Sequence, residues 1–181
     1  AFAGVMALSQ RKRGAGEEGT VEARSLNERF EMHEEAVRAV TEDPLESKAR
    51  GKDQKKEKKA KRKAIKQALK AENDSEARRP RVFVLDFDGD MQASQVDQLR
   101  EEVSAILPVV GESDKVLLRL ESGGGVVHGY GLAASQLTRL KDAGVTLTVS
   151  VDKVAASGGY MMACVGDEII AAPFAILGSI G

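Results

Sequence analysis

One short segment combines the residue types that nucleophilic chemistry needs: Ala155-Ala156-Ser157-Gly158-Gly159-Tyr160, which follows an apolar run and opens a short helical pattern. Small neighbours leave the Ser157 hydroxyl uncovered, and the amino end of the following helix favours developing negative charge. Gly158 can present its backbone N–H beside the serine, which is half of an oxyanion hole. The pattern predicts a serine nucleophile. The alternative is a tight turn in which Ser157 only caps the helix.

A second glycine-rich segment, Leu120-Glu121-Ser122-Gly123-Gly124-Gly125, also lies between an apolar run and a helical pattern. Three consecutive glycines let the backbone approach a ligand closely and direct N–H groups at an anionic oxygen. The phosphate-binding spacings G-x-x-x-x-G-K and G-x-G-x-x-G do not fit, because His128 stands where the last glycine of the second would be. The segment is interpreted as a further oxyanion donor or as a flexible turn.

The elements that must position both segments follow a strand-helix alternation from residue 81 onward. Such alternation predicts an α/β fold with a largely parallel sheet, which binds ligands at the carboxyl ends of its strands. Both glycine-rich segments fall at such ends. Apolar runs predict strands over 82–87, 115–120, 145–151 and 168–172, and helical spacing predicts helices over 95–107, around 132–140 and over 160–165. The residues expected to point inward from the last two helices are Leu132, Ala133, Leu137, Leu140, Met161, Met162 and Cys164.

Composition limits the other classes of site. The chain has 181 residues, 42% of them hydrophobic and 30% charged, which suits one domain with an appendage. A single cysteine excludes an internal disulfide and, with two histidines, leaves little for a metal centre. No metal and no cofactor are expected.

Positive charge is concentrated in one segment of the chain. Residues 48–70 contain twelve Lys and Arg against two acidic residues, although the net charge of the whole chain is −1. A solvated basic helix or a partly disordered linker is the simplest interpretation, and Pro44 interrupts the charged segment before it. Of the polyanionic partners, membrane lipid is favoured and nucleic acid is not expected, because residues 1–8 form an apolar run that ends at Arg11, Lys12 and Arg13.

Three stretches resemble a known family. RVFVLDFDGDM, LRLESGGGVVHGYGLAASQL and TVSVDKVAASGGYMMACVGDEIIAAPFAILGSIG, with the Lys-rich leader before them, resemble the SohB-type members of the S49 peptidases. The resemblance implies a ClpP/crotonase-like fold and hydrolysis of peptide bonds by a serine nucleophile with a lysine base. It divides the chain into a membrane-anchor remnant or disordered terminus over 1–10, a charged leader over 11–79 and the N-terminal part of a catalytic domain over 80–181.

The resemblance assigns roles residue by residue. Ser157 corresponds to the nucleophile, and Gly158 to the oxyanion donor that follows it. Gly124 and Gly125 correspond to the loop that supplies the other donor, in which Gly123 replaces the usual proline. Ser179 in Gly178-Ser179-Ile180-Gly181 corresponds to a second serine that orients the lysine.

The general base is expected beyond Gly181, so residues 1–181 alone are not expected to cut peptides. Burial would make such a lysine lose its proton more readily. Two internal residues are weaker candidates. Lys153 precedes Ser157 by four residues but is interpreted as a surface lysine, and His128 as a polar residue at a helix start.

Two rival functions follow from the same residues. Asp86 and Asp88 end a hydrophobic strand, as the carboxylates of magnesium-dependent phosphatases do, although Asp90 stands where those enzymes have threonine. A non-catalytic binding or assembly module of the same fold is the other rival. The family further implies a peptide or protein substrate, self-association and a bacterial inner-membrane location, with the sidedness left open.

Overall fold

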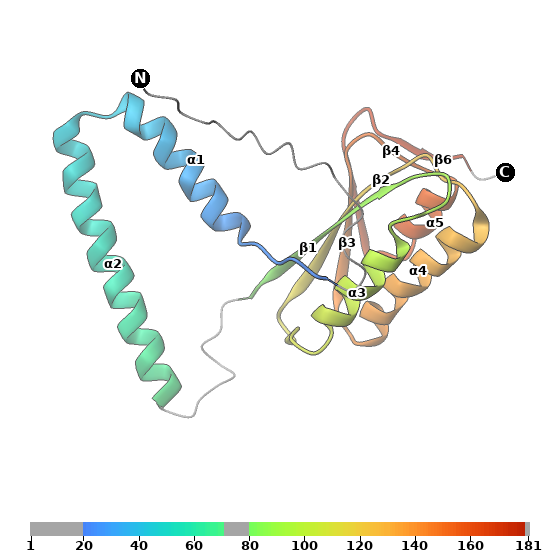
Figure 1. The fold of residues 1–181 in the computed structure, drawn as a ribbon, viewed down its shortest axis with the longest axis horizontal. Coiled ribbons are helices and arrows are strands. Elements are labelled where there is room, and N and C mark those ends of the chain that lie inside the picture. Colours follow the sequence, from blue (N-terminus) through green and yellow to red (C-terminus); the bar gives the residue numbers. More distant parts are fainter. Residues whose placement is uncertain (1–19, 71–79, 180–181) are drawn as a thin grey trace, which may run out of the picture. The chain divides into compact units, whose positions relative to one another are not determined.

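The computed structural model describes residues 20–70 and 80–179, so the predicted anchor over 1–10 lies outside the described residues. The chain separates into a leader unit, residues 22–79, and a sheet unit that contains residues 80–181. Figure 1 shows the elements in order. They are α1 (Leu26–Thr41), α2 (Pro44–Lys70), β1 (Val82–Gly89), α3 (Val96–Ile106), β2 (Lys115–Ser122), α4 (Val127–Asp142), β3 (Thr146–Val151), β4 (Val154–Ala156), α5 (Gly158–Ala163), β5 (Glu168–Ala171) and β6 (Ile176–Gly178).

The leader unit consists of two helices with little core, as the sequence predicts. Helix α1 begins with a capping serine, because the Glu28 N–H donates to Ser25 Oγ at 3.2 Å. Helix α2 begins at Pro44, whose missing N–H costs nothing at a first helical position. No residue of α1 is buried, and Val40 is 87% exposed. The leader therefore gains little stability from apolar burial.

The sheet unit is built around β2, which pairs with three parallel strands. β1 pairs with β2 along its whole length, from Val82 opposite Lys115 to Gly89 opposite Ser122. On the other edge β3 pairs with the first part of β2, and β4 pairs only with Ser122 at its end. β5 then extends β3 and β6 extends β4, again in parallel. The sheet thus divides at the carboxyl end of β2, which is the curled arrangement of the ClpP/crotonase-like fold.

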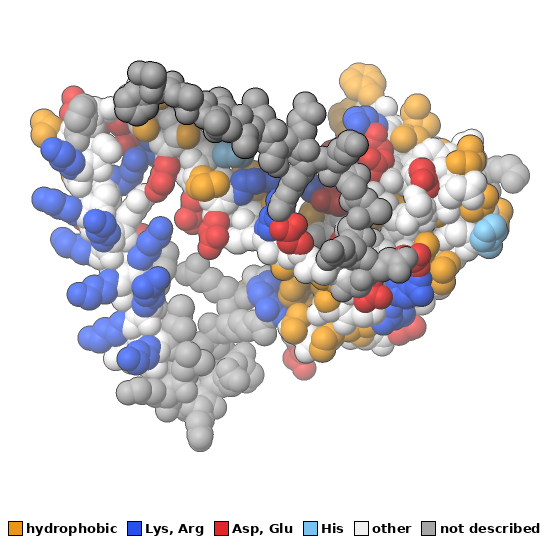
Figure 2. Space-filling view, in the orientation of Figure 1, with side chains coloured by type: hydrophobic (Ala, Val, Ile, Leu, Met, Phe, Trp, Pro, Cys, Tyr) orange, Lys and Arg blue, Asp and Glu red, His pale blue; other side chains and the backbone are white. Residues whose placement is uncertain are grey.

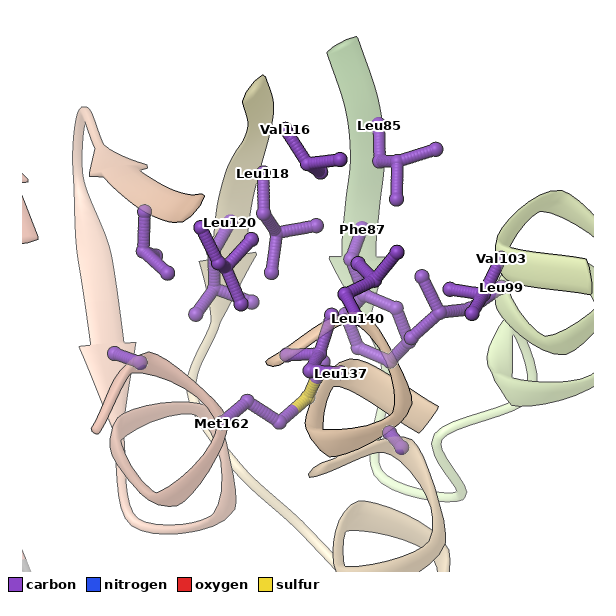
Figure 3. Packing of buried hydrophobic residues seen from close by; sticks show 14 of the residues in the cluster. Leu85, Phe87, Leu99, Val103, Val116, Leu118, Leu120, Leu137, Leu140 and Met162 are labelled. Carbon is purple, nitrogen blue, oxygen red and sulfur yellow. The ribbon is translucent and has the colours of Figure 1, made fainter. Parts of the chain in front are cut away.

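The three helices α3, α4 and α5 cover one face of this sheet. Alternate strand residues, such as Leu118 on β2 and Val149 on β3, point into that side and are fully buried. Figure 3 shows the strand side chains meeting those of the helices, with Met162 of α5 at the lower edge. The opposite face is polar, since Asp86 and Arg119 lie beside each other on it and are exposed. This alternation decides which strand side chains are buried. Because the strands are parallel, the loops that follow them lie at the carboxyl edge of the sheet.

The sheet unit also differs from the sequence prediction in detail. Helix α4 turns Tyr130 inward, whereas Leu132, which is expected in the core, is 42% exposed. Helix α5 buries Met162 but leaves Met161 exposed, because only one face of the helix packs on the sheet. Cys164, the residue after its end, is exposed as well. The expectation of core positions for Leu132, Met161 and Cys164 was therefore wrong. β6 was not predicted, since three residues give no period to detect.

Candidate active site

Ser157 stands at the corner between β4 and α5 in a strained conformation. Its φ of 50° and ψ of −116° lie in a region that residues with a side chain rarely occupy. Two backbone hydrogen bonds hold it there: the Ser157 N–H donates to the Gly178 carbonyl at 2.7 Å, and the Ser157 carbonyl accepts from the Met161 N–H at 3.0 Å. The corner therefore points its side chain away from both the strand and the helix.

The hydroxyl of Ser157 is exposed and unengaged. The side chain occupies the cap position of α5 but makes no capping hydrogen bond. In the described part of the chain no other side chain hydrogen-bonds to it. A strained backbone with a free hydroxyl is typical of a nucleophile elbow, because strain persists where the surrounding fold holds it for a function.

The glycine loop after β2 lies directly against this corner. Gly124 has a φ of +87°, and a Cβ atom placed on it would lie 2.7 Å from the Ser157 Cβ and 2.9 Å from the Gly158 nitrogen. Only glycine fits such an approach. The two segments singled out by the sequence are thus in contact, although they are separated by more than thirty residues.

The amide groups of the two loops are not equivalent. The Gly124 N–H donates to Ser122 Oγ at 3.0 Å. Among the described residues, the Gly125 and Gly158 amides have no hydrogen-bond acceptor. The Gly158 amide adjoins Ser157, and Gly125 follows the glycine that contacts this corner, so both are candidates for the donors that an oxyanion hole requires.

Tyr130 contacts both the glycine loop and the Ser157 corner. The sequence analysis did not identify this residue. Its hydroxyl donates to the Asp90 carbonyl at 2.7 Å and is hydrogen-bonded to the Ser122 hydroxyl. A Cβ on Gly158 would lie 2.4 Å from the Tyr130 ring. Burial raises the pKa of the Tyr130 phenol, so it stays protonated. The spacing of Tyr130, Ala133, Leu137 and Leu140 on one helical face could have revealed it.

Ser179 is carried by the strand that pairs with β4. Ala156 lies opposite Gly178 in the β4–β6 register, so Ser179 follows the residue whose carbonyl binds the Ser157 amide. Ser179 has a φ of 53° and is exposed. Both serines therefore sit in left-handed conformations at the same end of the sheet.

The two internal candidates for a base do not approach the hydroxyl of Ser157. Lys153 forms an exposed ion pair with Glu121, with Nζ at 2.8 and 3.0 Å from its carboxylate oxygens. The hydrogen bonds that Lys153 donates to Glu121 raise the pKa of Lys153, which is opposite to what a base needs. His128 is exposed on the first turn of α4, and no hydrogen bond links it to Ser157.

The acidic residues of β1 have other partners. Asp86 forms a bidentate ion pair with Arg119, at 2.5 Å to Nε and 2.7 Å to an Nη nitrogen. Asp90 accepts hydrogen bonds from Ser94, and this hydroxyl lowers the pKa of its carboxyl. Asp88 is exposed. Within residues 20–70 and 80–179, no cluster of acidic, histidine or cysteine side chains could hold a metal ion.

Among the described residues, no helix is both long enough and apolar enough to cross a bilayer.

Comparison with known proteins gives two adjoining family matches. Residues 1–137 match Peptidase family S49 N-terminal, and residues 139–181 match Peptidase family S49. The chain is 53% identical to "Probable protease SohB" of Haemophilus influenzae over 175 residues, which are 96% of this chain and 50% of that relative.

Two further relatives match shorter parts. A "Probable protease SohB" of Buchnera aphidicola (subsp. Schlechtendalia chinensis) is 67% identical over 102 residues, 56% of this chain and 33% of the relative. "Protease 4" of Salmonella typhi is 34% identical over 93 residues, 51% of this chain and 14% of the relative. The chain thus spans about half the length of the Haemophilus relative and less of the others. Because one family match covers residues 1–137, well over half of the chain, and a second covers residues 139–181, which include Ser157, this chain belongs to peptidase family S49.

Proposed function

We propose that this chain supplies the nucleophile half of a serine-type endopeptidase. The observation that carries the proposal is the Ser157 corner: a strained, exposed serine whose hydroxyl has no hydrogen-bond partner among residues 20–70 and 80–179, and which touches a glycine loop. In the proposed reaction Ser157 Oγ attacks the scissile carbonyl carbon. The carbonyl oxygen becomes negative, and the amides of Gly125 and Gly158 stabilise it. Gly124 lets the glycine loop approach Ser157 closely. Its own N–H is not assigned to the oxyanion, because it donates to Ser122 Oγ.

The proton of Ser157 needs an acceptor, and the proposal places it on a lysine C-terminal to Gly181. That lysine would return the proton to the leaving amine, and water would then hydrolyse the acyl-enzyme. Ser179 would orient the lysine through a hydrogen bond. Its position directly after β6, the strand paired with β4, supports this role, because the preceding Gly178 carbonyl binds the Ser157 amide. Lys153 is not assigned it, because its pairing with Glu121 keeps the ammonium form.

The experiment is serine replacement in a protein extended to the length of the Haemophilus relative. Ser157→Ala should abolish cleavage of an unfolded protein substrate while leaving the unfolding midpoint nearly unchanged, because the side chain is exposed and unbonded. Ser135→Ala, at an exposed serine on α4, is the matched control and should keep full activity. Mass spectrometry after treatment with a fluorophosphonate should find the adduct on Ser157.

Two results would reject the proposal. Retained cleavage by the Ser157→Ala protein would place the nucleophile elsewhere. A protein of full length that neither cleaves substrates nor reacts with the fluorophosphonate would support the non-catalytic binding module instead. The earlier expectations of a membrane anchor, self-association and an inner-membrane location stay predictions.

A further inference from the structure

Helix α2 carries an unbalanced row of positive charge. Nine of its Lys and Arg side chains are described as exposed, and none of them forms an ion pair within the described residues. Figure 2 shows these blue side chains along the length of the helix. The nine are Lys48, Lys52, Lys55, Lys56, Lys58, Lys59, Arg62, Lys63 and Lys66. They define what we call the basic row.

The basic row occupies one side of the helix. With successive residues 100° apart, all nine lie within an arc of about 160°. The acidic residues Glu46, Asp53 and Glu57 lie together on the opposite side. The helix turns another part of its surface towards α1, where Arg50, Gly51 and Gln54 are half-buried and Arg50 pairs with Glu42. Lys58 lies at the edge of the row nearest α1 and borders a hollow lined by Glu31, Glu34 and Glu35. The other eight cations are left over after the described contacts inside the leader unit are made.

Such a row needs an external partner to be balanced. At 1.5 Å per residue, the row from Lys48 to Lys66 is about 27 Å long, so it presents a straight, positively charged edge on that scale. Like charges spaced three and four residues apart repel each other and destabilise an isolated helix. A polyanion bound along the edge removes that repulsion.

We infer that the basic row is a docking surface for an anionic lipid bilayer. Eight of the nine cations are lysines, which attract a charged surface as point charges, whereas sequence-specific recognition of nucleic acid relies on arginine forks and side chains that read bases. The row contains no aromatic, Asn or Gln side chain for that purpose. A flat bilayer also matches a straight row better than a grooved duplex does. Because the row has no apolar side chains to insert, binding is purely electrostatic and reversible by salt.

The test is co-sedimentation of the 181-residue chain with vesicles. Vesicles of phosphatidylcholine with 30% phosphatidylglycerol should bind the chain at 0.1 M NaCl, and pure phosphatidylcholine vesicles should not. At 1 M NaCl, where charges are screened beyond about 3 Å, binding should be lost. The variant with Lys52, Lys56, Lys59 and Lys63 all changed to Gln should bind at least about a hundredfold more weakly, since each lysine near the surface contributes about fivefold.

The matched control changes the same four lysines to Arg. It keeps the charge and should bind as the parent does, and circular dichroism should show the same helix content in all three proteins. Equal binding to the neutral vesicles, unchanged binding by the Gln variant, or tighter binding to a 20-base-pair DNA duplex than to the anionic vesicles would each overturn the inference. None of these results depends on whether Ser157 is a nucleophile.

Discussion

The sheet unit and the leader unit keep their shape by opposite means. The sheet unit buries a continuous set of apolar residues between one sheet face and three helices. The leader unit buries no residue of α1 and covers its helices with charge. A packed core can hold a strained residue such as Ser157 in place, because the surrounding contacts resist relaxation. A helix without a core can present charge to a surface but cannot fix a reactive atom.

The largest expected effect tests the core itself. Leu118→Ala removes a fully buried side chain from β2 and should lower the free energy of unfolding by about 2–5 kcal/mol. Val37→Ala replaces an α1 side chain that is 64% exposed and should change the free energy of unfolding by less than about 0.5 kcal/mol. Urea unfolding followed by tyrosine fluorescence reports on the sheet unit alone, because both tyrosines of the chain, Tyr130 and Tyr160, belong to it.

Two further measurements sharpen this contrast. Far-ultraviolet circular dichroism follows the helices of both units, so a shift caused by Val37→Ala would be visible there. Leu132→Ala on α4, at a side chain 42% exposed, should have a small effect although it lies in the sheet unit. If Val37→Ala destabilised the chain as much as Leu118→Ala, the leader would have a core of its own and the comparison would fail.

The next largest change in unfolding free energy is expected where Gly158 packs against the buried Tyr130 ring. Gly158→Ala would place a Cβ 2.4 Å from the Tyr130 ring, which is held on all sides, and should cost about 1–3 kcal/mol. Gly123→Ala is the matched control, since nothing lies within 4 Å of its Cβ position, and it should be tolerated. The same urea titration measures both. Equal tolerance of the two changes would mean that the corner is not packed as described.

A smaller loss of unfolding free energy is expected when only the Tyr130 hydroxyl is removed. Tyr130→Phe keeps the ring but loses the hydrogen bonds to Asp90 and Ser122, which should cost about 1 kcal/mol. Because Ser122 holds the Gly124 amide, we also expect a fall in kcat with little change in KM in a protein of full length. Tyr160→Phe is the control. A proportional loss of folded protein, with kcat per folded molecule unchanged, would show that Tyr130 only stabilises the fold.

Much of the fold was predictable, because strong periods mark its long elements. The alternation of Val116, Leu118 and Leu120 predicts β2, and the spacing of Leu99, Val103 and Ile106 predicts the buried face of α3; the structure confirms both. Short elements were harder, since β4 and β6 have three residues each and are fixed by pairing with distant strands.

The site divides in the same way. Local pattern singled out Ser157 and the glycines, because small residues at a strand end are visible in the sequence. The contact between the two loops and the support from Tyr130 depend on packing between β2, α4 and α5, which no local pattern encodes. The resemblance to the S49 peptidases was confirmed by the family matches, whereas the roles it assigns to Ser157, Ser179 and the glycines await the experiments above.

The last expected effect is the pH dependence of the unfolding free energy of the sheet unit. Asp114 accepts hydrogen bonds from the amides of Gly111 and Arg81 at 2.9 and 2.7 Å, and these, with the Arg81 guanidinium, lower the pKa of its carboxyl. Asp167 accepts from the Leu147 amide, which lowers its pKa as well. A carboxyl whose pKa is lower in the folded state stabilises the fold above its unfolded pKa and loses that contribution as the pH falls.

The unfolding free energy of the sheet unit should therefore be steady above about pH 4 and decline below it, towards the folded-state pKa values. Asp114→Asn should weaken the sheet unit at neutral pH and flatten the acid decline, because one of the carboxyls with a lowered pKa no longer titrates. Tyrosine fluorescence in urea at a series of pH values measures both. An acid decline of the same slope in the Asn variant would mean that Asp114 is not part of the acid response, and that the loop before β2 is held mainly by its backbone contacts.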